Sequence, residues 1–405
     1  MANQFQTIAV SGVLKNWYTG VVIDQFNNDI PWYNQVEKGR EKFSGLQVVR
    51  ALKVRRNPGI GATSDGGALP SIGNSTEVQA QISARFHYAR FGLTGPLMKS
   101  AQGDKGAFVN QIEYQTTTTM EDFKNDFNRA LFWDGSGKLG EVAAAAVAST
   151  VITANGRSTG EDGSKYLGDA YVGMVIDIVT SGGIVEASGV TILGSTGTST
   201  VTLTLSAAVT VSANSLIVRA NSYNLEVQGL RTSLDGGTGT IFGINRAIYG
   251  QYQGNLVNAN GNQLTLDLMK QGWNAGRQRG GAKYQVVFTD FETERMYEKL
   301  LVADRRFVQQ KIAGDGTFAS KDENFLQYGG IAMMVDKDCT RDIYMLDFKQ
   351  WKKYILSDLE WCDESGSQMI VQTGVDAWEL RLRYFANLFP EKPSAQVRVT
   401  GYISP

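Results

Sequence analysis

The segment from Gly103 to Trp133 constrains the fold most, because its hydrophobic pattern is both long and regular. Its apolar residues recur at spacings of three, four or their sums, which is the period of one face of an α-helix. These residues are Phe108, Ile112, Met120, Phe123, Phe127 and Leu131. Asp104 is suited to cap the start, and the turn sequence of residues 134–137 ends the pattern. We therefore predict one amphipathic helix roughly 40 Å long, with the β-branched threonines at 116–119 favouring a bend.

Composition narrows the class of protein. The chain has 405 residues, enough for several domains, and its 39 Lys and Arg nearly balance its 40 Asp and Glu. Such a balance does not favour nucleic-acid recognition. Cys339 and Cys362 lack the spacing of a disulfide framework and fit a reducing compartment. We find no secretory signal pattern, and no apolar run approaches the ~20 residues that span a bilayer, so we expect no membrane partner.

Two segments before the helix carry apolar or basic side chains without an evident core of their own. Residues 1–46 are polar with scattered aromatic residues, and they predict an arm, with a short helix at Val21–Asn28 stopped by Pro31. Strand-like runs at Gln47–Arg56 and Ser75–Gly95 flank a glycine-rich stretch and predict a long hairpin. A two-stranded ribbon is marginally stable alone, so it must lie against another surface. The candidate contacts are Trp17, Tyr18 and Trp32 in the arm, and Arg50, Lys53, Arg55, Arg56, Ile60, Leu69, Arg85 and Arg90 in the hairpin.

The basic residues of the hairpin leave three interpretations open. They face acidic protein surface, which we favour, or they are simply solvated, or they contact nucleic acid.

Composition changes after the helix. Residues 139–221 are rich in Ala, Gly, Ser, Thr and Val, with short β-type runs separated by turn clusters. The runs lie at Val172–Thr180, Val190–Leu193, Thr200–Leu205 and Ser215–Ala220. This pattern predicts an inserted all-β sandwich or barrel.

The remainder reads as mixed α and β. We predict a helix capped by Asn262 and ended by Gly280-Gly281, then a strand Tyr284–Thr289 leading into a helix Phe291–Asp304. Further elements are expected as strands at Ile331–Val335 and Ile343–Leu346, a helix at Phe348–Leu356, and late strands at 378–388 and Ala395–Ile403. We expect these two late strands to pair antiparallel and to cover the long helix.

The sequence contains no recognisable catalytic or cofactor-binding motif. His87 is the single histidine, and it stands in an alternating strand pattern, so no Ser/His/Asp or Cys/His system is expected. The glycine-rich stretch Gly135–Gly140 lacks phosphate-loop spacing and reads as a helix terminator, and Leu234–Gly243 lacks a dinucleotide fingerprint. We therefore predict no catalytic, cofactor-binding or metal-binding residues, and a protein that is not an enzyme.

An arm, a basic hairpin and a separate β insert all need neighbours, which indicates a self-assembling structural protein. The order of these segments, with the sequences MEDFKNDFNRALFWDGSGKLG, YQVVFTDFETERMYEKLL and YGGIAMMVDKDCTRDIYMLD, resembles the major capsid proteins of tailed bacteriophages. That family has the Hong Kong 97-type fold. The resemblance covers essentially the whole chain, and it lies in the order of the segments and in their residue patterns. No short invariant motif defines the family.

The resemblance implies an α+β fold in named regions. Residues 1–46 would form the N-terminal arm, 47–98 the extended loop, 99–138 with 376–405 the peripheral domain with its spine helix, and 222–375 the axial domain; residues 139–221 depart from the minimal fold.

The resemblance also implies a function. Hexamers and pentamers of the chain would form an icosahedral head, assembled in the bacterial cytoplasm, that encloses double-stranded DNA contacted non-specifically. Portal, scaffolding and decoration or cement proteins would be its other partners, and its place would be the virion. The alternative is a phage tail, fibre or adhesin-type structural protein, which the β-rich insert favours.

Overall fold

The computed structural model describes residues 31–96, 105–157, 170–197, 201–303, 326–363 and 369–404, without the side chains of residues 31, 105–113, 302 and 303. The predicted helix at Val21–Asn28 lies outside these ranges. Pro31 begins a helix, α2 (Pro31–Gln35), where we had expected it to end one. A proline suits the first turn because its fixed φ is helical and its missing N–H has no partner there anyway.

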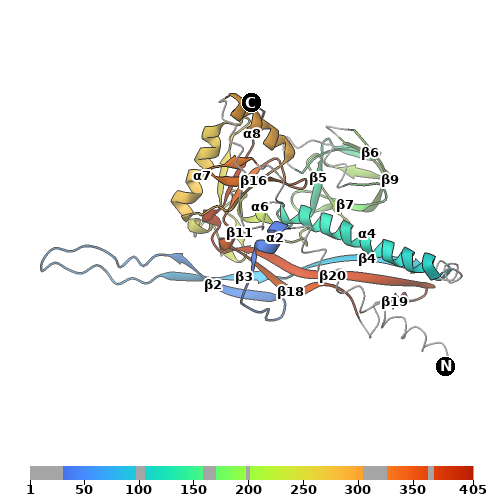
Figure 1. Cartoon of the computed structure of the whole chain (residues 1–405), viewed down its shortest axis with the longest axis horizontal. Helices are drawn as coiled ribbons and strands as arrows, with labels where there is room; N and C mark the ends of the chain where they lie inside the picture. The colour runs from blue at the N-terminus through green and yellow to red at the C-terminus, as the bar shows by residue number, and fades with distance from the viewer. Residues whose placement is uncertain are drawn as a thin grey trace.

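The long helix is α4, which spans Lys105–Leu131 and begins and ends within two residues of the predicted segment. It continues through Thr116–Thr119 as helix. After it the chain turns sharply: the Ser136 N–H donates to Asp134 Oδ1 over 2.9 Å, and Gly135 has a φ of 85°. Figure 1 shows α4 lying along the strands β4 (Arg85–Thr94) and β20 (Ala377–Pro390).

Those two strands belong to one sheet. β20 pairs antiparallel with β4 along residues 377–386 and with β18 (Trp351–Trp361) along residues 382–390. Two short strands complete it, β1 (Glu37–Lys38) beside β18 and β19 (Ile370–Val371) beside β20. Alternate residues of β20 face α4, and Leu380, Leu382, Tyr384, Ala386 and Leu388 join the core beneath the helix.

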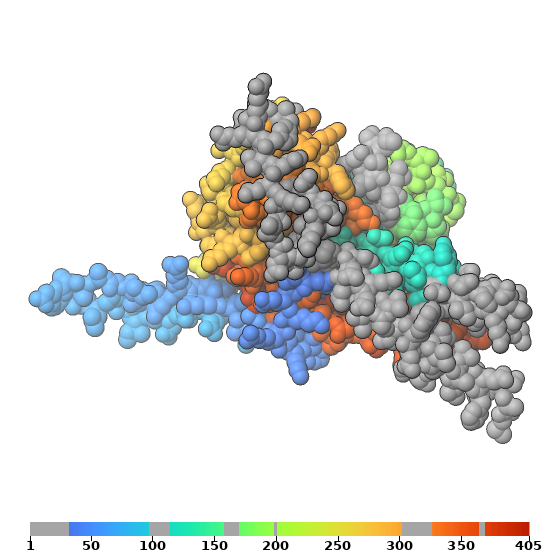
Figure 2. Space-filling model, viewed as in Figure 1, coloured from blue at the N-terminus to red at the C-terminus, as the bar shows by residue number. Residues whose placement is uncertain are grey.

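The predicted second arm of the hairpin divides into two strands. β2 (Gln47–Arg55) pairs antiparallel with β3 (Thr76–Ser83), whereas β4 begins two residues later and pairs with β20. The base of the β2–β3 hairpin packs against Phe242 and Ile244, beside the small two-stranded unit β11 (Thr240–Ile241) and β12 (Ile244–Asn245), and against Phe389. Beyond this base the hairpin projects from the body of the molecule (Figures 1 and 2).

The segment after α4 is all-β. Six strands close into a barrel in the order β10-β5-β6-β9-β8-β7. Their bounds are β5 Lys138–Val142, β6 Ala146–Asn155, β7 Val175–Val179, β8 Val185–Thr196, β9 Val201–Val211 and β10 Leu216–Arg219. The sequence analysis missed β5 and β6, because β5 begins inside the glycine-rich turn and β6 is weakly apolar. Inward residues such as Ile152, Ile176, Ile192 and Leu203 fill the barrel as a core separate from that under α4.

A six-stranded mixed sheet forms the remaining body, in the order β13-β21-β17-β14-β16-β15. Its bounds are β13 Asn255–Asn258, β14 Val286–Thr289, β15 Gln327–Tyr328, β16 Ile331–Val335, β17 Ile343–Leu346 and β21 Val397–Thr400. Packed on it is α7 (Leu266–Gly280), which Thr265 caps in place of the predicted Asn262, and it ends at Gly281 with a φ of 63°. α8 (Phe291–Ala303) starts as predicted, with Asp290 accepting from the Thr293 N–H.

Short helical turns join these parts. They are α6 Leu230–Ser233, η1 Gly250–Tyr252, η2 Phe348–Gln350 and η3 Pro393–Ala395.

Two predictions about the C-terminal half are wrong. The helix predicted at Phe348–Leu356 is a single 3₁₀ turn, η2, followed by β18, because the bulky residues of this segment find partners across β20. The late strands do not pair with each other: β20 lies under α4, while β21 pairs with β13 and β17 in the other sheet. The turn of residues 391–396 separates them, and the buried side chains of β21 belong to the core beneath α7.

Candidate assembly surfaces

The tip of the β2–β3 hairpin exposes apolar side chains that its own chain does not cover. Ile60 and Leu69 are each 82% exposed and Ile72 is fully exposed. Figure 2 shows this end of the hairpin standing clear of the rest of the molecule. Water around several large aliphatic side chains on one projecting segment is unfavourable, so the tip is suited to bind another protein surface.

The basic residues of the hairpin divide into two groups. Lys53, Arg55 and Arg56 are exposed and make no ion pair within the described part of the chain. Arg50 instead lies between Glu41 and Glu391 of its own chain, with an N–O distance of 2.5 Å to each. Only the first group is therefore available to an external partner.

The two basic residues of β4 also differ from each other. Arg85 donates to the carbonyl oxygen of Asn224 over 2.7 Å, and burial lowers the pKa of its guanidinium. Arg90 keeps 76% of its side chain exposed and lies 4.0 Å from Glu379.

Trp32 was expected to contact a neighbouring copy, and the structure corrects this. It is 2% exposed and packs against Phe132, Phe288 and Phe348 of its own chain. An indole enclosed in this way has no surface left for a partner. Trp17 and Tyr18, the other two aromatic anchors of the predicted arm, lie outside the described residues.

The apolar face of α4 points into the core. Met120, Phe123, Phe127 and Leu131 are at most 6% exposed, and the ring of Phe127 makes edge contacts with Tyr33, His87 and Tyr384. The side chains of Phe108 and Ile112, predicted on the same face, lie outside the described part. The helix is thus anchored on the sheet of β4 and β20 along its described C-terminal half.

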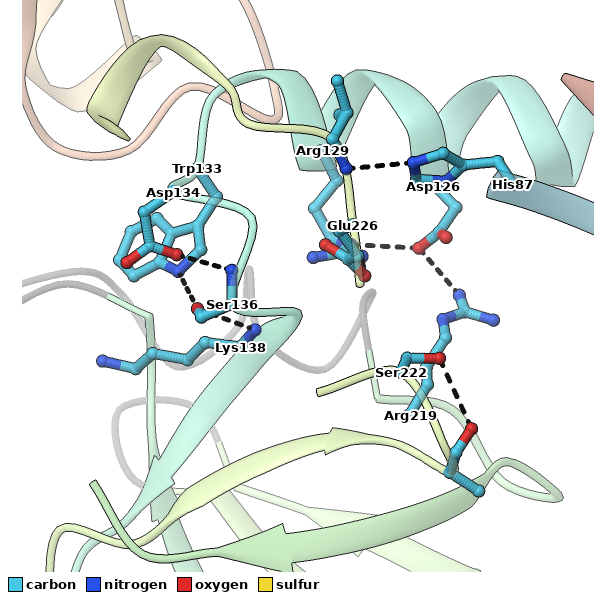
Figure 3. A network of polar contacts seen from close by, with 12 residues as sticks. His87, Asp126, Arg129, Trp133, Asp134, Ser136, Lys138, Arg219, Ser222 and Glu226 are labelled. Atoms are coloured by element: carbon cyan, nitrogen blue, oxygen red, sulfur yellow. Dashed lines mark hydrogen bonds and ion pairs between the residues drawn. The ribbon is translucent and has the colours of Figure 1, made fainter. Parts of the chain in front are cut away.

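A network of buried and partly buried charges joins α4 to the barrel (Figure 3). Arg129 of α4 pairs with Asp126 over 3.0 Å and with Glu226, and Arg219 of β10 reaches the same Asp126 oxygen over 2.9 Å. His87 of β4 lies beside them and accepts the Val227 N–H over 3.0 Å. Because these residues come from the helix, the barrel and the sheet, the network fixes the barrel relative to the body.

The surroundings set the protonation of this network. Burial raises the pKa of Asp126, but Arg129 and Arg219 outweigh it and lower the value to about 2. Burial raises the pKa of Glu226 above its usual range, with Arg129 pulling the other way. Burial lowers the pKa of His87 to about 4, so its imidazole is neutral and serves as a hydrogen-bond acceptor.

Sequence reasoning missed this network. Its members are separated by up to 139 residues, and none belongs to a motif. The only available signal was the placement of Asp126 and Arg129 one turn apart near the end of a long helix, which is a common surface pattern.

Among the residues described, no helix is both long and apolar enough to cross a membrane. In the same ranges no three or more His, Cys, Asp and Glu side chains come together as a set of metal ligands.

Comparison with solved structures identifies the fold. A chain in the capsid asymmetric unit of cyanophage A-1(L) superposes with a TM-score of 0.57 at 12% identity, covering 92% of each chain. A capsid chain of a native GTA particle gives a TM-score of 0.48 at 10% identity, over 93% of this chain and 91% of that one. The SrpI encapsulin of Synechococcus elongatus PCC 7942 gives 0.44 at 8% identity, over 92% and 87%.

No protein-family model matches the sequence, and no curated protein matches it. The first of these superpositions nevertheless covers nearly the whole chain. The predicted α+β fold is therefore confirmed: this chain has the fold of a chain in a phage capsid.

Proposed function

We propose that this chain is a major capsid protein, a structural protein and not an enzyme, whose hexamers and pentamers form the icosahedral head of a tailed phage around double-stranded DNA. The single observation that carries the proposal is the fold shared over 92% of the chain with a phage capsid chain. The exposed apolar tip of the hairpin supports it, because Ile60, Leu69 and Ile72 need a partner surface that their own chain does not supply.

The regions have separate roles in this proposal. The β2–β3 hairpin, residues 47–83, forms an extended loop that lies over a neighbouring copy, whereas β4 stays in the sheet beneath α4. The arm is the part of residues 1–46 that precedes Trp32, because Trp32 belongs to the core of its own chain.

The peripheral domain is built on α4 and the sheet of β4, β18, β19 and β20, and the axial domain on the six-stranded sheet with α7 and α8. This moves β18 and β19 out of the axial domain expected at 222–375, and β21 out of the peripheral segment expected at 376–405. Residues 139–221 make the inserted β domain. Each contact between copies is modest, but many contacts in a closed shell act together, so the assembled particle is stable.

The chain's own copies are its first partners in this proposal, and portal, scaffolding and decoration proteins would join them in the bacterial cytoplasm. The near balance of 39 basic and 40 acidic residues suits a shell that encloses DNA without binding it tightly.

Electron microscopy of the purified full-length protein tests the proposal. We expect capsomer rings or icosahedral particles in negative stain. In particles purified from infected cells, the enclosed DNA should be protected from added nuclease by the closed shell. A chain that stays monomeric at high concentration, or that forms rods, contradicts it.

A further inference from the structure

The sheet beneath α4 carries exposed aromatic rings on its other face. Ala89 and Phe91 of β4 pack against the core under the helix, and successive residues of a strand point to opposite faces. Phe86 and Tyr88 therefore lie on the face away from α4, where they are 43% and 60% exposed. The ring of Phe385 on β20 joins them, with centroids 4.9 Å from Phe86 and 5.3 Å from Tyr88. We call these three residues the aromatic face. Exposed rings gathered in this way are typical anchors of protein interfaces.

The next residue of β4 on this face is a cation that its own chain holds weakly. Arg90 is largely exposed and lies 4.0 Å from Glu379. The two arginines beside it on β20 are engaged more closely: Arg381 pairs with the same Glu379, and Arg383 pairs with Glu360 over 2.8 Å. Among the described residues, Arg90 is thus the cation of this face most available to an anion from outside.

The tip of the β2–β3 hairpin has the complementary chemistry. Its exposed aliphatic side chains, Ile60, Leu69 and Ile72, are suited to cover aromatic rings. Residues 57–75 contain a single charged side chain, the carboxylate of Asp65, and this residue is exposed. An aliphatic tip with one anion therefore matches an aromatic face with one available cation.

Within one copy the tip and the aromatic face lie apart. β3 leads directly into β4 along the long axis of the molecule, and the tip precedes β3 at the far end (Figure 1). The strand residues from Thr76 to Tyr88 span roughly 40 Å when extended. A chain cannot cover its aromatic face with its own tip, so the occupant that the geometry allows is the tip of a second copy. Such a head-to-tail contact closes into a ring when the rotation allows.

We propose that the aromatic face, Phe86, Tyr88 and Phe385, receives the hairpin tip of a second copy of this chain, with Asp65 of that copy paired to Arg90. The inference rests on the proposed function, in which the hairpin lies over a neighbour, and it names the surface on which the tip binds.

Cross-linking in the full-length protein tests the contact without removing any side chain that makes it. Ser71→Cys places a thiol on the tip, and Gly92→Cys places one on β4 two residues beyond Arg90, where a Cβ has room. The native Cys339 and Cys362 are buried. Treated with a short bifunctional maleimide, Ser71→Cys/Gly92→Cys should give covalent multimers on a denaturing gel. The matched control is Ser71→Cys/Val147→Cys, with the second thiol on the exposed barrel strand β6, and it should give about tenfold fewer.

A charge swap tests the ion pair. Asp65→Arg or Arg90→Asp alone should raise the chain concentration needed for half-maximal assembly about fivefold, because like charges then meet in every contact. Asp65→Arg/Arg90→Asp should return to within about twofold of wild type. The control Asp65→Arg/Lys270→Asp has the same net charge but changes an exposed lysine of α7, and it should stay as defective as Asp65→Arg.

The inference and the proposed function fail on different results. Closed shells in which Ser71→Cys/Gly92→Cys cross-links no better than the control overturn the contact alone, as does a swap that recovers no better than Asp65→Arg/Lys270→Asp. Cross-linked dimers or rings that never close into shells keep the contact and overturn the proposed function. A chain that stays monomeric at high concentration overturns both.

Discussion

At the scale of single residues, Arg129 is the side chain that holds together the charged network between α4 and the barrel. It is 2% exposed and lies between the carboxylates of Asp126 and Glu226. Replacing it with an apolar side chain leaves the buried Glu226 and the partly buried Asp126 with one fewer cation, which costs far more than the pair itself contributes.

Arg129→Met should therefore lower the free energy of unfolding by about 3–5 kcal/mol, measured by urea titration of the unassembled protein. Arg219→Met is the matched control, because among the described residues Arg219 makes its ion pair with one carboxylate, that of Asp126, and keeps 32% of its side chain exposed. Its loss should be about 1 kcal/mol. Equal losses for the two variants would mean that Arg129 does not hold the network together.

His87 makes stability depend on pH. Its pKa is lowered from 6.5 to about 4 in the folded chain, chiefly by burial, with Arg129 and Arg85 adding to the effect and Asp126 opposing it. Between these values the unfolded chain takes up a proton that the folded chain does not, so stability falls as pH drops from 6.5 toward 4. The full loss is about 3 kcal/mol and does not grow further below pH 4.

His87→Gln, which keeps an acceptor near the Val227 N–H, should remove this part of the pH dependence. The difference between wild type and variant, taken at pH 7, 6, 5 and 4 by urea titration, should change progressively over this range. A difference that stays constant with pH would show that His87 titrates normally in the folded protein.

At the scale of elements, α4 is held by its aromatic face. Phe127 is 1% exposed and touches four aromatic rings of the core, so Phe127→Ala should destabilise the fold by about 3–5 kcal/mol. Tyr114→Ala on the same helix is the control, since Tyr114 is 64% exposed and its loss should cost little. The more severe pair Phe123→Asp/Phe127→Asp should abolish soluble expression. A soluble double mutant that assembles would mean that the helix presents another face to the sheet.

The hairpin is predicted to serve assembly and not folding. Deleting residues 58–73 removes the exposed tip but leaves the base, where Val48 and Ile82 pack under Phe389. The shortened subunit should keep the thermal midpoint of the unassembled wild type and lose most of its particle yield in electron microscopy. An unchanged particle yield would show that the tip makes no contact with a neighbouring subunit that assembly needs.

How well the sequence predicts an element depends on whether local residues or distant strands stabilise it. The bounds of α4 and α8 follow from local periodicity and caps, so they were predicted closely. β18 was taken for a helix because its large side chains also fit a helical spacing, and the strand that decides the matter, β20, lies some 30 residues later. The break at Ala84 between β3 and β4 cannot be recognised in the sequence. Apolar and polar residues keep alternating across it, although the pairing partner changes from β2 to β20.

At the scale of the whole molecule, the chain divides its surfaces between folding and assembly. The three main cores, under α4, inside the barrel and beneath α7, hold most of the buried apolar side chains of the body. The apolar side chains of the hairpin tip stay exposed, and Lys53, Arg55 and Arg56 make no ion pair in the described part of the chain. Such leftover surfaces, repeated on every copy, give many weak contacts that become strong together in a closed shell.

The measurement that tests this account most directly is an electron-microscopy map, at side-chain resolution, of particles formed by the full-length protein. The account predicts a closed icosahedral shell in which Ile60, Leu69 and Ile72 of each hairpin are covered by a neighbouring copy. A map in which the hairpins touch only their own subunit, or one of particles without closed symmetry, would contradict it.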